Sequence, residues 1–240
     1  MQMRRLFAVL LAAAMVLTLV ACASKQTADQ PSDPGQQAEG SETNNNAPTE
    51  TKEAEEDNSA KENRILTVYF SADNTKDVDA VSSATPMANG TASVEWIANI
   101  IHDYAGGDLV PIIPSADYPL EYNALADYAK KERDDGGRPA FESLSVDPTS
   151  YDVVFIGYPI WWYEMPMIMD TFFDTYDFSG VTIVPFNTHA GSRDGGTYGD
   201  IKELEPNATV LDGLALRGED VGKSSAKTSV EEWLRGLSLE

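Results

Sequence analysis

The sequence has one cysteine, two histidines and few basic residues among its 240 positions. Because Cys22 is the only cysteine, no intrachain disulfide can form, and the two distant histidines do not indicate a metal site. The pattern GxxxxGKS/T is absent, so a nucleoside-triphosphate site is not expected. The 39 acidic and 17 basic residues give a net charge of −22, which argues against nucleic acid and favours basic partner proteins at low salt.

Residues 1–22 have the pattern of an export signal. Arg4 and Arg5 precede an apolar run, residues 6–20, that is too short to span a bilayer comfortably. The run ends in Leu-Val-Ala-Cys, which resembles the bacterial lipobox, where a signal peptidase cuts before a cysteine that carries lipid. We therefore expect a lipoprotein signal peptide and acyl chains on Cys22, which anchor the protein to a bacterial cell membrane outside the cytoplasm. The alternative is a plain secretory signal with an incidental cysteine.

Residues 23–63 have the composition of a spacer. Their only apolar side chains are alanine and proline, and ten acidic residues stand against three lysines. Such a segment cannot bury enough surface to offset the entropy of ordering, so we expect no fixed structure. Residues 64–240 carry 29 acidic and 12 basic residues and are long enough for one domain with a full core.

Within residues 64–240, apolar runs typical of strands alternate with amphipathic helical patterns. The predicted strands are Ile65–Ser71, Asp108–Ile113, Val153–Tyr158, Val181–Thr188 and Thr209–Leu216. The predicted helices start at Thr91, lie within Ala116–Asp134, span Met165–Tyr176 and Thr197–Leu204, and start near Thr228. This alternation predicts a parallel sheet with helices on both faces, and the proline in the second strand predicts an edge position.

Two further expectations concern the helices. Tyr104, Tyr122 and Tyr128 fall on the apolar faces of the first two helices, so we expect them to point inward. Thr228 and Ser229 each precede a glutamate by three residues, which predicts a capping box at the start of the last helix.

Three loops follow strands of this sheet and should meet at its carboxyl edge, where such sheets bind ligands. The loop after Ser71 is rich in hydroxyls and amides, Ile160–Met165 is aromatic, and Thr188–Gly196 is rich in glycine. A helix N-terminus, an aromatic wall and a backbone-rich loop together suit a flat heterocycle that carries a phosphate tail.

Four pieces of residues 64–240 resemble the flavodoxin-like family, and most closely the flavodoxins found in bacterial lipoproteins. They are LTVYFS, GGDL, GYPIWWYEMP and FNTHAGSRDGG. The resemblance implies a flavodoxin-like α/β fold, a doubly wound five-stranded parallel sheet in the order 2-1-3-4-5 with helices on both faces. It also implies noncovalent FMN and transfer of one or two electrons. In the family, the aromatic piece borders the flavin ring.

The family wraps the FMN phosphate in a loop of the form Ser/Thr-x-Thr-Gly-x-Thr, from which residues 71–75 depart. The glycine is missing, and Asp73 should repel a phosphate. Either the loop still serves with Asp73 turned outward, or the motif is split between Ser71 and residues 90–93. We favour the split version because the helix dipole and free N–H groups lie there; a plain helix cap and loop is the alternative. The candidate ligands are Ser71, Asn74, Thr75, Gly90, Thr91 and Ser93.

The second and third loops supply the candidates for contact with the flavin ring. These are Pro159, Ile160, Trp161, Trp162, Tyr163, Thr188, His189, Gly191, Ser192 and Gly195. One of the three aromatic residues could instead be a core residue that packs on the following helix. His189 could hydrogen-bond the flavin, cap a helix or do neither, whereas His102 lies on a helix flank and is assigned to the surface.

We expect an electron carrier that exchanges electrons with a redox partner protein or a small acceptor, rather than a reductase with its own substrate. Two alternatives remain open: a flavodoxin-fold binding module that has lost FMN, and an FMN-dependent quinone-type reductase. A serine hydrolase built on Ser71 and His189 is disfavoured because the sequence has no nucleophile elbow.

Overall fold

The structure, a computed structural model, describes residues 63–72, 91–237 and 239. The predicted export signal, Cys22 and residues 23–62 of the predicted spacer lie outside these residues, as do Asp73, Asn74, Thr75 and Gly90. In the ranges that it describes, no helix is long and apolar enough to cross a membrane.

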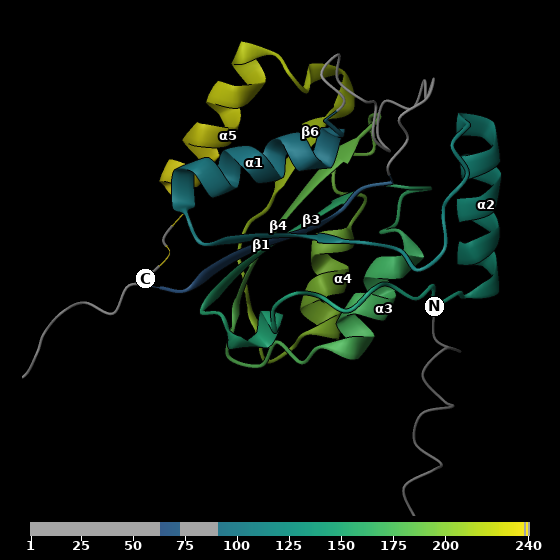
Figure 1. Cartoon of the computed structure of the whole chain (residues 1–240). Coiled ribbons are helices and arrows are strands. Elements are labelled where there is room, and N and C mark those ends of the chain that lie inside the picture. Colours follow the sequence, from purple (N-terminus) through teal and green to yellow (C-terminus); the bar gives the residue numbers. More distant parts are fainter. Residues whose placement is uncertain (1–62, 73–90, 238, 240) are drawn as a thin grey trace, which may run out of the picture. The chain divides into compact units, whose positions relative to one another are not determined.

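One parallel sheet runs through the domain (Figure 1). Its strands are β1 Ile65–Phe70, β2 Asp108–Ile112, β3 Val153–Pro159, β4 Thr182–His189, β5 Thr209–Val210 and β6 Leu214–Arg217. The order β2-β1-β3-β4-β5 confirms the predicted 2-1-3-4-5 topology. The edge position of β2 is confirmed as well, and it explains why the strand tolerates Pro111, which has no N–H to donate to a further strand.

The fifth predicted strand is interrupted in the structure. Instead of one strand over Thr209–Leu216, β5 pairs with the start of β4 and β6 pairs with its end. The break lies opposite Pro185 of β4, which has no N–H to donate to a neighbouring strand. A proline in the partner strand therefore accounts for a break that the sequence of residues 209–216 does not show by itself.

Alternation along the strands divides the core into two layers. In β1, Leu66, Val68 and Phe70 join one buried cluster and Tyr69 joins the other, as the two-residue period of a strand requires. In β3, Gly157 pairs in register with Phe186 of β4 and has no room for a side chain, because a Cβ there would lie 2.2 Å from the Phe186 ring.

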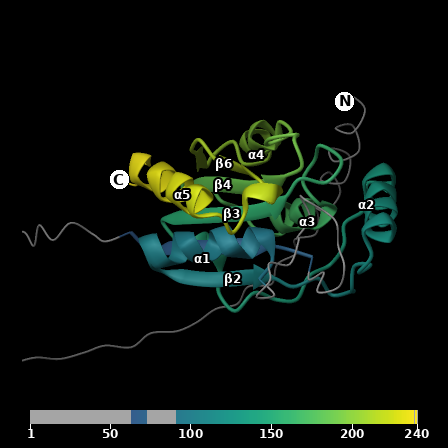
Figure 2. The ribbon, with the colours of Figure 1, turned by 90° about the horizontal axis from the view of Figure 1, so that it is seen from above.

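Helices cover both faces of the sheet (Figures 1 and 2). They are α1 Ser93–Ala105, α2 Tyr122–Asp135, α3 Met167–Thr175, α4 Thr197–Leu204 and α5 Ser224–Gly236. α1 and α5 lie on one face and α3 and α4 on the other, whereas α2 stands beyond the carboxyl ends of the strands. Because α2 buries only Leu125 and Ala129, most of its surface remains exposed.

Two predictions about the helices are wrong. Tyr104, Tyr122 and Tyr128 are exposed, because other residues fill the buried faces of their helices, mainly isoleucine in α1 and Leu125 and Ala129 in α2. The capping box at Thr228 and Ser229 is also absent, since α5 begins four residues earlier, at Ser224. The two hydroxyls instead donate to carbonyl oxygens one turn back, at 3.1 Å each.

Candidate functional site

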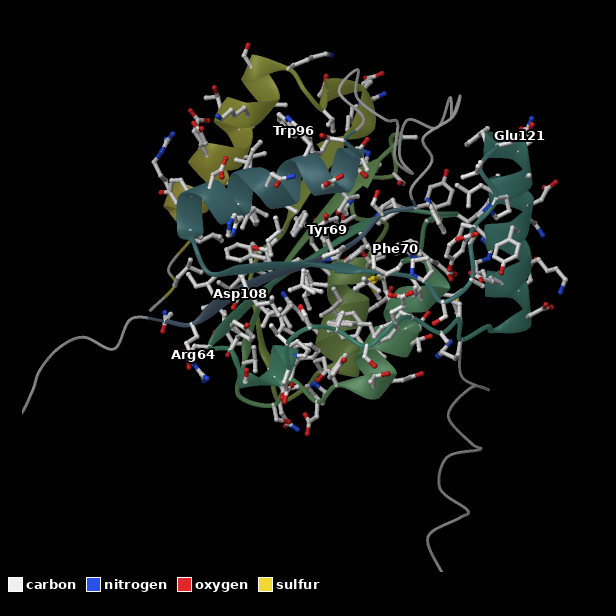
Figure 3. The ribbon with its side chains drawn as sticks, in the orientation of Figure 1. Arg64, Tyr69, Phe70, Trp96, Asp108 and Glu121 are labelled. Atoms are coloured by element: carbon white, nitrogen blue, oxygen red, sulfur yellow. The ribbon has the colours of Figure 1, made fainter. Side chains whose placement is uncertain are left out.

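The candidate site lies at the carboxyl edge of the sheet. In Figure 3, Phe70 marks the end of β1 on the side of α2, and Arg64 marks the opposite end of the same strand. Two of the three predicted loops are described in full at this edge, and Ser71 and Ala72 represent the first. α1 begins at the same edge (Figure 1).

Residues 161–164 form a tight turn of unusual composition. The backbones of Trp161 and Glu164 exchange two hydrogen bonds of 3.0 Å, and the two central residues have positive φ, 53° at Trp162 and 66° at Tyr163. This is the geometry of a type I′ turn, which normally has asparagine or glycine at its centre. Each L-residue in this left-handed conformation costs about 1 to 2 kcal/mol, so surrounding contacts must hold the turn in place.

α2 supplies the first of these contacts. The Nε1 atom of Trp162 donates to the carbonyl oxygen of Ala126 at 2.9 Å. The Arg133 guanidinium lies 5.7 Å from the centroid of the Trp162 ring, within cation–π range. Its Nη1 atom donates to the Trp162 carbonyl oxygen at 3.4 Å. The indole is therefore fixed against α2 although 43% of the residue is exposed.

The glycine-rich loop supports the turn from the other side. Gly195 has φ 63°, and a Cβ on it would lie 2.6 Å from the carbonyl oxygen of Tyr163. Tyr163 itself is 71% exposed. Glycine at position 195 therefore lets the two loops pack backbone against backbone, and the Tyr163 side chain projects from the edge where they meet.

A pocket of about 480 Å³ opens between this turn and α2. It is lined by Tyr122, Leu125, Ala126, Ala129, Ile160, Trp161, Trp162, Tyr163, Ala190, Gly191 and Ser192. Its size and its mainly apolar lining are those of a site for a small organic ligand. Six of the predicted ring contacts thus come together around one cavity, Ile160 to Tyr163 from the second loop and Gly191 and Ser192 from the third.

Trp161 combines the two roles that the sequence left open. It is a core residue, 8% exposed, with ring centroids 5.6 Å from Phe70 and 5.5 Å from Tyr118. It also lines the pocket, and its buried Nε1 atom has no hydrogen-bond partner in the described parts of the chain. Because an unmatched buried donor is costly, this indole N–H is suited to an acceptor atom on a ligand.

Buried hydrogen bonds fix the glycine-rich loop to the strands beneath it. The Thr197 hydroxyl donates to the Asp194 carbonyl oxygen at 2.7 Å, which leaves Tyr158 as the donor in its 2.9 Å bond to Thr197. Asn187 donates to the carbonyl oxygen of Arg193 at 3.1 Å. Burial raises the pKa of Tyr158, so this hydroxyl stays protonated and keeps its donor role.

His189 is the last residue of β4 and forms a hydrogen bond with the backbone of the glycine-rich loop. Its Nδ1 atom accepts the N–H of Gly191 at 2.9 Å, so the neutral ring carries its proton on Nε2. Burial, aided by Arg217 and Arg193, lowers the pKa of this imidazole. His189 does not line the pocket, and Gly191 and Gly195 direct their N–H groups to acceptors within the loop.

Pro159 and Thr188 lie in the sheet under the pocket. They pair in register, both are buried, and the Thr188 carbonyl oxygen accepts the N–H of Ile160 at 2.9 Å. They position the start of the aromatic loop and do not line the cavity.

The first loop shows one favourable and one opposing feature for an anion. The Ser71 Oγ atom is buried and has no partner among the described residues, and α1 begins nearby with Thr91 before it and the buried Ser93 as its first residue. However, the Glu95 carboxylate accepts the N–H of Ala92 at 3.2 Å and brings negative charge to this helix start. Its position three residues after the N-cap was a signal that the sequence offered for it.

Sequence reasoning missed the wall that α2 contributes. Tyr122 was predicted to point inward, and Ala126, Arg133 and Ala190 were not singled out. The available signal was the small apolar face of α2, which is too small to hold a helix against a sheet without further contacts. No cluster of histidine, cysteine and acidic side chains able to hold a metal ion occurs within the described residues.

A doubly wound parallel sheet with a pocket at its carboxyl edge defines a flavodoxin-like α/β protein. Residues 64–237 match the profile of the flavodoxin family, so the chain belongs to that family.

Solved structures agree with this assignment. A candidate flavoprotein from Bacteroides eggerthii is 31% identical with a TM-score of 0.56, over 72% of this chain and 96% of that one. A candidate flavoprotein from Bacteroides uniformis is 26% identical with the same TM-score, over 73% of this chain and 99% of that one. No curated protein matches the chain.

Proposed function

We propose that this protein binds FMN noncovalently and transfers electrons outside the cytoplasm, held to a bacterial membrane by lipid on Cys22. The observation that carries the proposal is the pocket at the sheet edge, which Trp161 lines; the buried Nε1 atom of Trp161 and the Ser71 hydroxyl at the end of β1 have no hydrogen-bond partner among the described residues. Four such buried atoms occur in the described residues, and two of them lie at this edge.

The residues present suit a flavin. The pocket has aromatic and aliphatic walls for a flat ring, and the indole N–H of Trp161 offers a donor to a ring or tail acceptor. Ser71 and the start of α1, with Thr91 and Ser93, would hold the phosphate, where helix N–H groups favour an anion. Glu95 opposes this charge, so we expect weaker phosphate binding than a helix start without an acid would give.

FMN, when bound, supplies reversible transfer of one or two electrons. The chain's part is to hold the ring and to exclude water from one side of it. Trp162, fixed by Ala126 and Arg133, would form one wall, and the exposed Tyr163 would cover the edge. The net charge of −17 over residues 64–240 would attract a basic redox partner at low salt.

The proposal is tested by FMN titration followed through tryptophan fluorescence. Because ring stacking on an aromatic side chain contributes about 1 to 3 kcal/mol, Trp162→Ala should weaken FMN binding at least about fivefold. His102→Ala is the matched control, since His102 lies in the last turn of α1, whereas α1 begins at the carboxyl edge of the sheet. Equal losses in the two variants would remove the role given to the aromatic turn.

A small molecule that accepts electrons is the second candidate for the redox partner. Tyr122, Trp162 and Tyr163 line the pocket and are each more than 40% exposed, which favours stacking of a planar molecule at its mouth. Turnover with a pyridine nucleotide and a quinone would identify a reductase. Reduction and reoxidation without such turnover would identify a carrier.

A further inference from the structure

A second pocket, of about 330 Å³, lies between α2 and residues 115–118 and 137–140. Its lining includes Ser115, Tyr118, Tyr128, Glu132, Arg138 and Pro139. The rings of Tyr118 and Tyr128 meet edge to face with centroids 5.4 Å apart. The pocket therefore joins two phenol rings and one carboxylate, and none of them belongs to the lining of the first pocket.

Glu132 is half-buried, and within the described residues its carboxylate is bonded by a hydroxyl and by no basic group. Tyr118 Oη donates to Glu132 Oε2 at 3.2 Å, and Tyr128 lies close enough to lower the pKa of the same carboxylate. Several carboxylates among the described residues have a basic group within 4.0 Å, but Glu132 is not one of them. Burial raises the pKa of Glu132, and the two phenols lower it by a smaller amount.

Arg138 lines the same pocket, but its guanidinium is paired with acidic residues other than Glu132. Its Nε atom lies 2.6 Å from Asp174, and its Nη2 atom lies 3.8 Å from Asp170. The guanidinium is therefore balanced by two acidic side chains, and no basic group in the described ranges is paired with Glu132. A carboxylate has about four lone-pair positions, so the Tyr118 hydroxyl leaves room for a further N–H group.

We propose that this pocket binds an alkylammonium group, with Glu132 as its counter-ion and the rings of Tyr118 and Tyr128 as its walls. Aromatic faces attract such a cation, and a partly desolvated carboxylate gains more from a hydrogen-bonded cation than an exposed one does. The group can come from a small amine or from a lysine side chain of a partner protein. The proposal does not depend on FMN, so it stands or falls separately from the flavin site.

The first experiment measures n-butylammonium binding to the full-length protein in mild detergent by saturation-transfer NMR, with n-butanol as the uncharged analogue. We expect saturable binding of the ammonium ion alone. Because a hydrogen bond to a charged group is lost, Glu132→Gln should weaken binding about tenfold. Glu142→Gln makes the same change of charge at an exposed position and should alter binding less than about twofold.

A lysine source is tested with two acetylated, amidated tripeptides, Gly-Lys-Gly and Gly-norleucine-Gly. Binding of the lysine peptide as tight as that of n-butylammonium supports a partner's side chain, and binding of n-butylammonium alone supports a small amine. No saturable binding of either ammonium probe, or equal losses in Glu132→Gln and Glu142→Gln, would overturn the proposal.

The wild-type protein gives an independent check that needs no variant. Lowering the pH should abolish n-butylammonium binding as Glu132 becomes protonated, at a pH above the ordinary glutamate pKa of 4.5. The two phenols that face Glu132 stay neutral in this range, because burial raises the pKa of Tyr118 and Tyr128. Binding that persists at full strength through this titration would contradict the assignment.

Discussion

Replacing Tyr163 by glycine should stabilise the ligand-free protein relative to replacing it by alanine. Tyr163 has φ 66° and is 71% exposed, so both variants lose the same small amount of buried surface. Alanine keeps the left-handed strain of about 1 to 2 kcal/mol, whereas glycine removes it and loses about 0.5 to 1 kcal/mol to its greater freedom in the unfolded chain. The glycine variant should therefore be more stable than the alanine variant by about 0.5 to 1 kcal/mol.

Urea denaturation of the two variants measures this difference directly. The same pair of substitutions at Glu232, an exposed position inside α5, provides the matched control. At Glu232 the order of the two stabilities should reverse, with the glycine variant about 1 kcal/mol less stable than the alanine variant. A Tyr163→Gly variant that is less stable than Tyr163→Ala would refute the strained turn, and with it the idea that contacts from Arg133 and Gly195 hold it for a ligand.

Three other perturbations test the core, the loop anchor and the membrane anchor. Gly157→Ala should destabilise the fold by about 1 to 3 kcal/mol because its Cβ would lie 2.2 Å from the Phe186 ring, whereas Gly199→Ala in α4, with open space around it, should not lower the urea midpoint. The folded-state pKa of His189 lies below the ordinary 6.5. As the pH drops below about 6.5, the imidazole is therefore protonated in the unfolded chain before it is protonated in the folded protein, and the free energy of unfolding should fall. His189→Asn, which keeps an acceptor for the loop, should flatten this slope in urea melts between pH 7.5 and 5.5; an unchanged slope would exclude His189 as its source. Cys22→Ala should move the protein from the membrane fraction to the soluble fraction, and retention in the membrane would rule out a lipid anchor.

The sheet could be predicted from the sequence because its signals are local. Buried strands such as Val153–Pro159 are continuous apolar runs, and their alternation with helices fixes a parallel arrangement. The interruption between β5 and β6 could not be predicted in the same way, because its cause, Pro185, lies in another strand. The start of α5 was missed since Ser224 and Lys223 carry no distinctive cap, while a better capping pattern occurs inside the helix.

The sequence indicated the aromatic turn as a candidate ligand wall, but it did not indicate how the turn is built. Three large aromatic residues after a buried strand indicated a ligand wall. Nothing in their order indicated left-handed backbone at Trp162 and Tyr163, since asparagine and glycine normally mark such turns. The part played by α2 also depends on tertiary contacts, because the partners of Trp162 are Ala126 and Arg133, which lie 36 and 29 residues away in the chain.

The most direct test of the proposed function is the visible absorption spectrum of residues 64–240 after incubation with FMN and gel filtration. The account predicts a yellow protein that carries one flavin per chain, with quenched tryptophan fluorescence. A colourless protein with unchanged tryptophan fluorescence would contradict it and would favour a flavodoxin-fold module that no longer binds FMN.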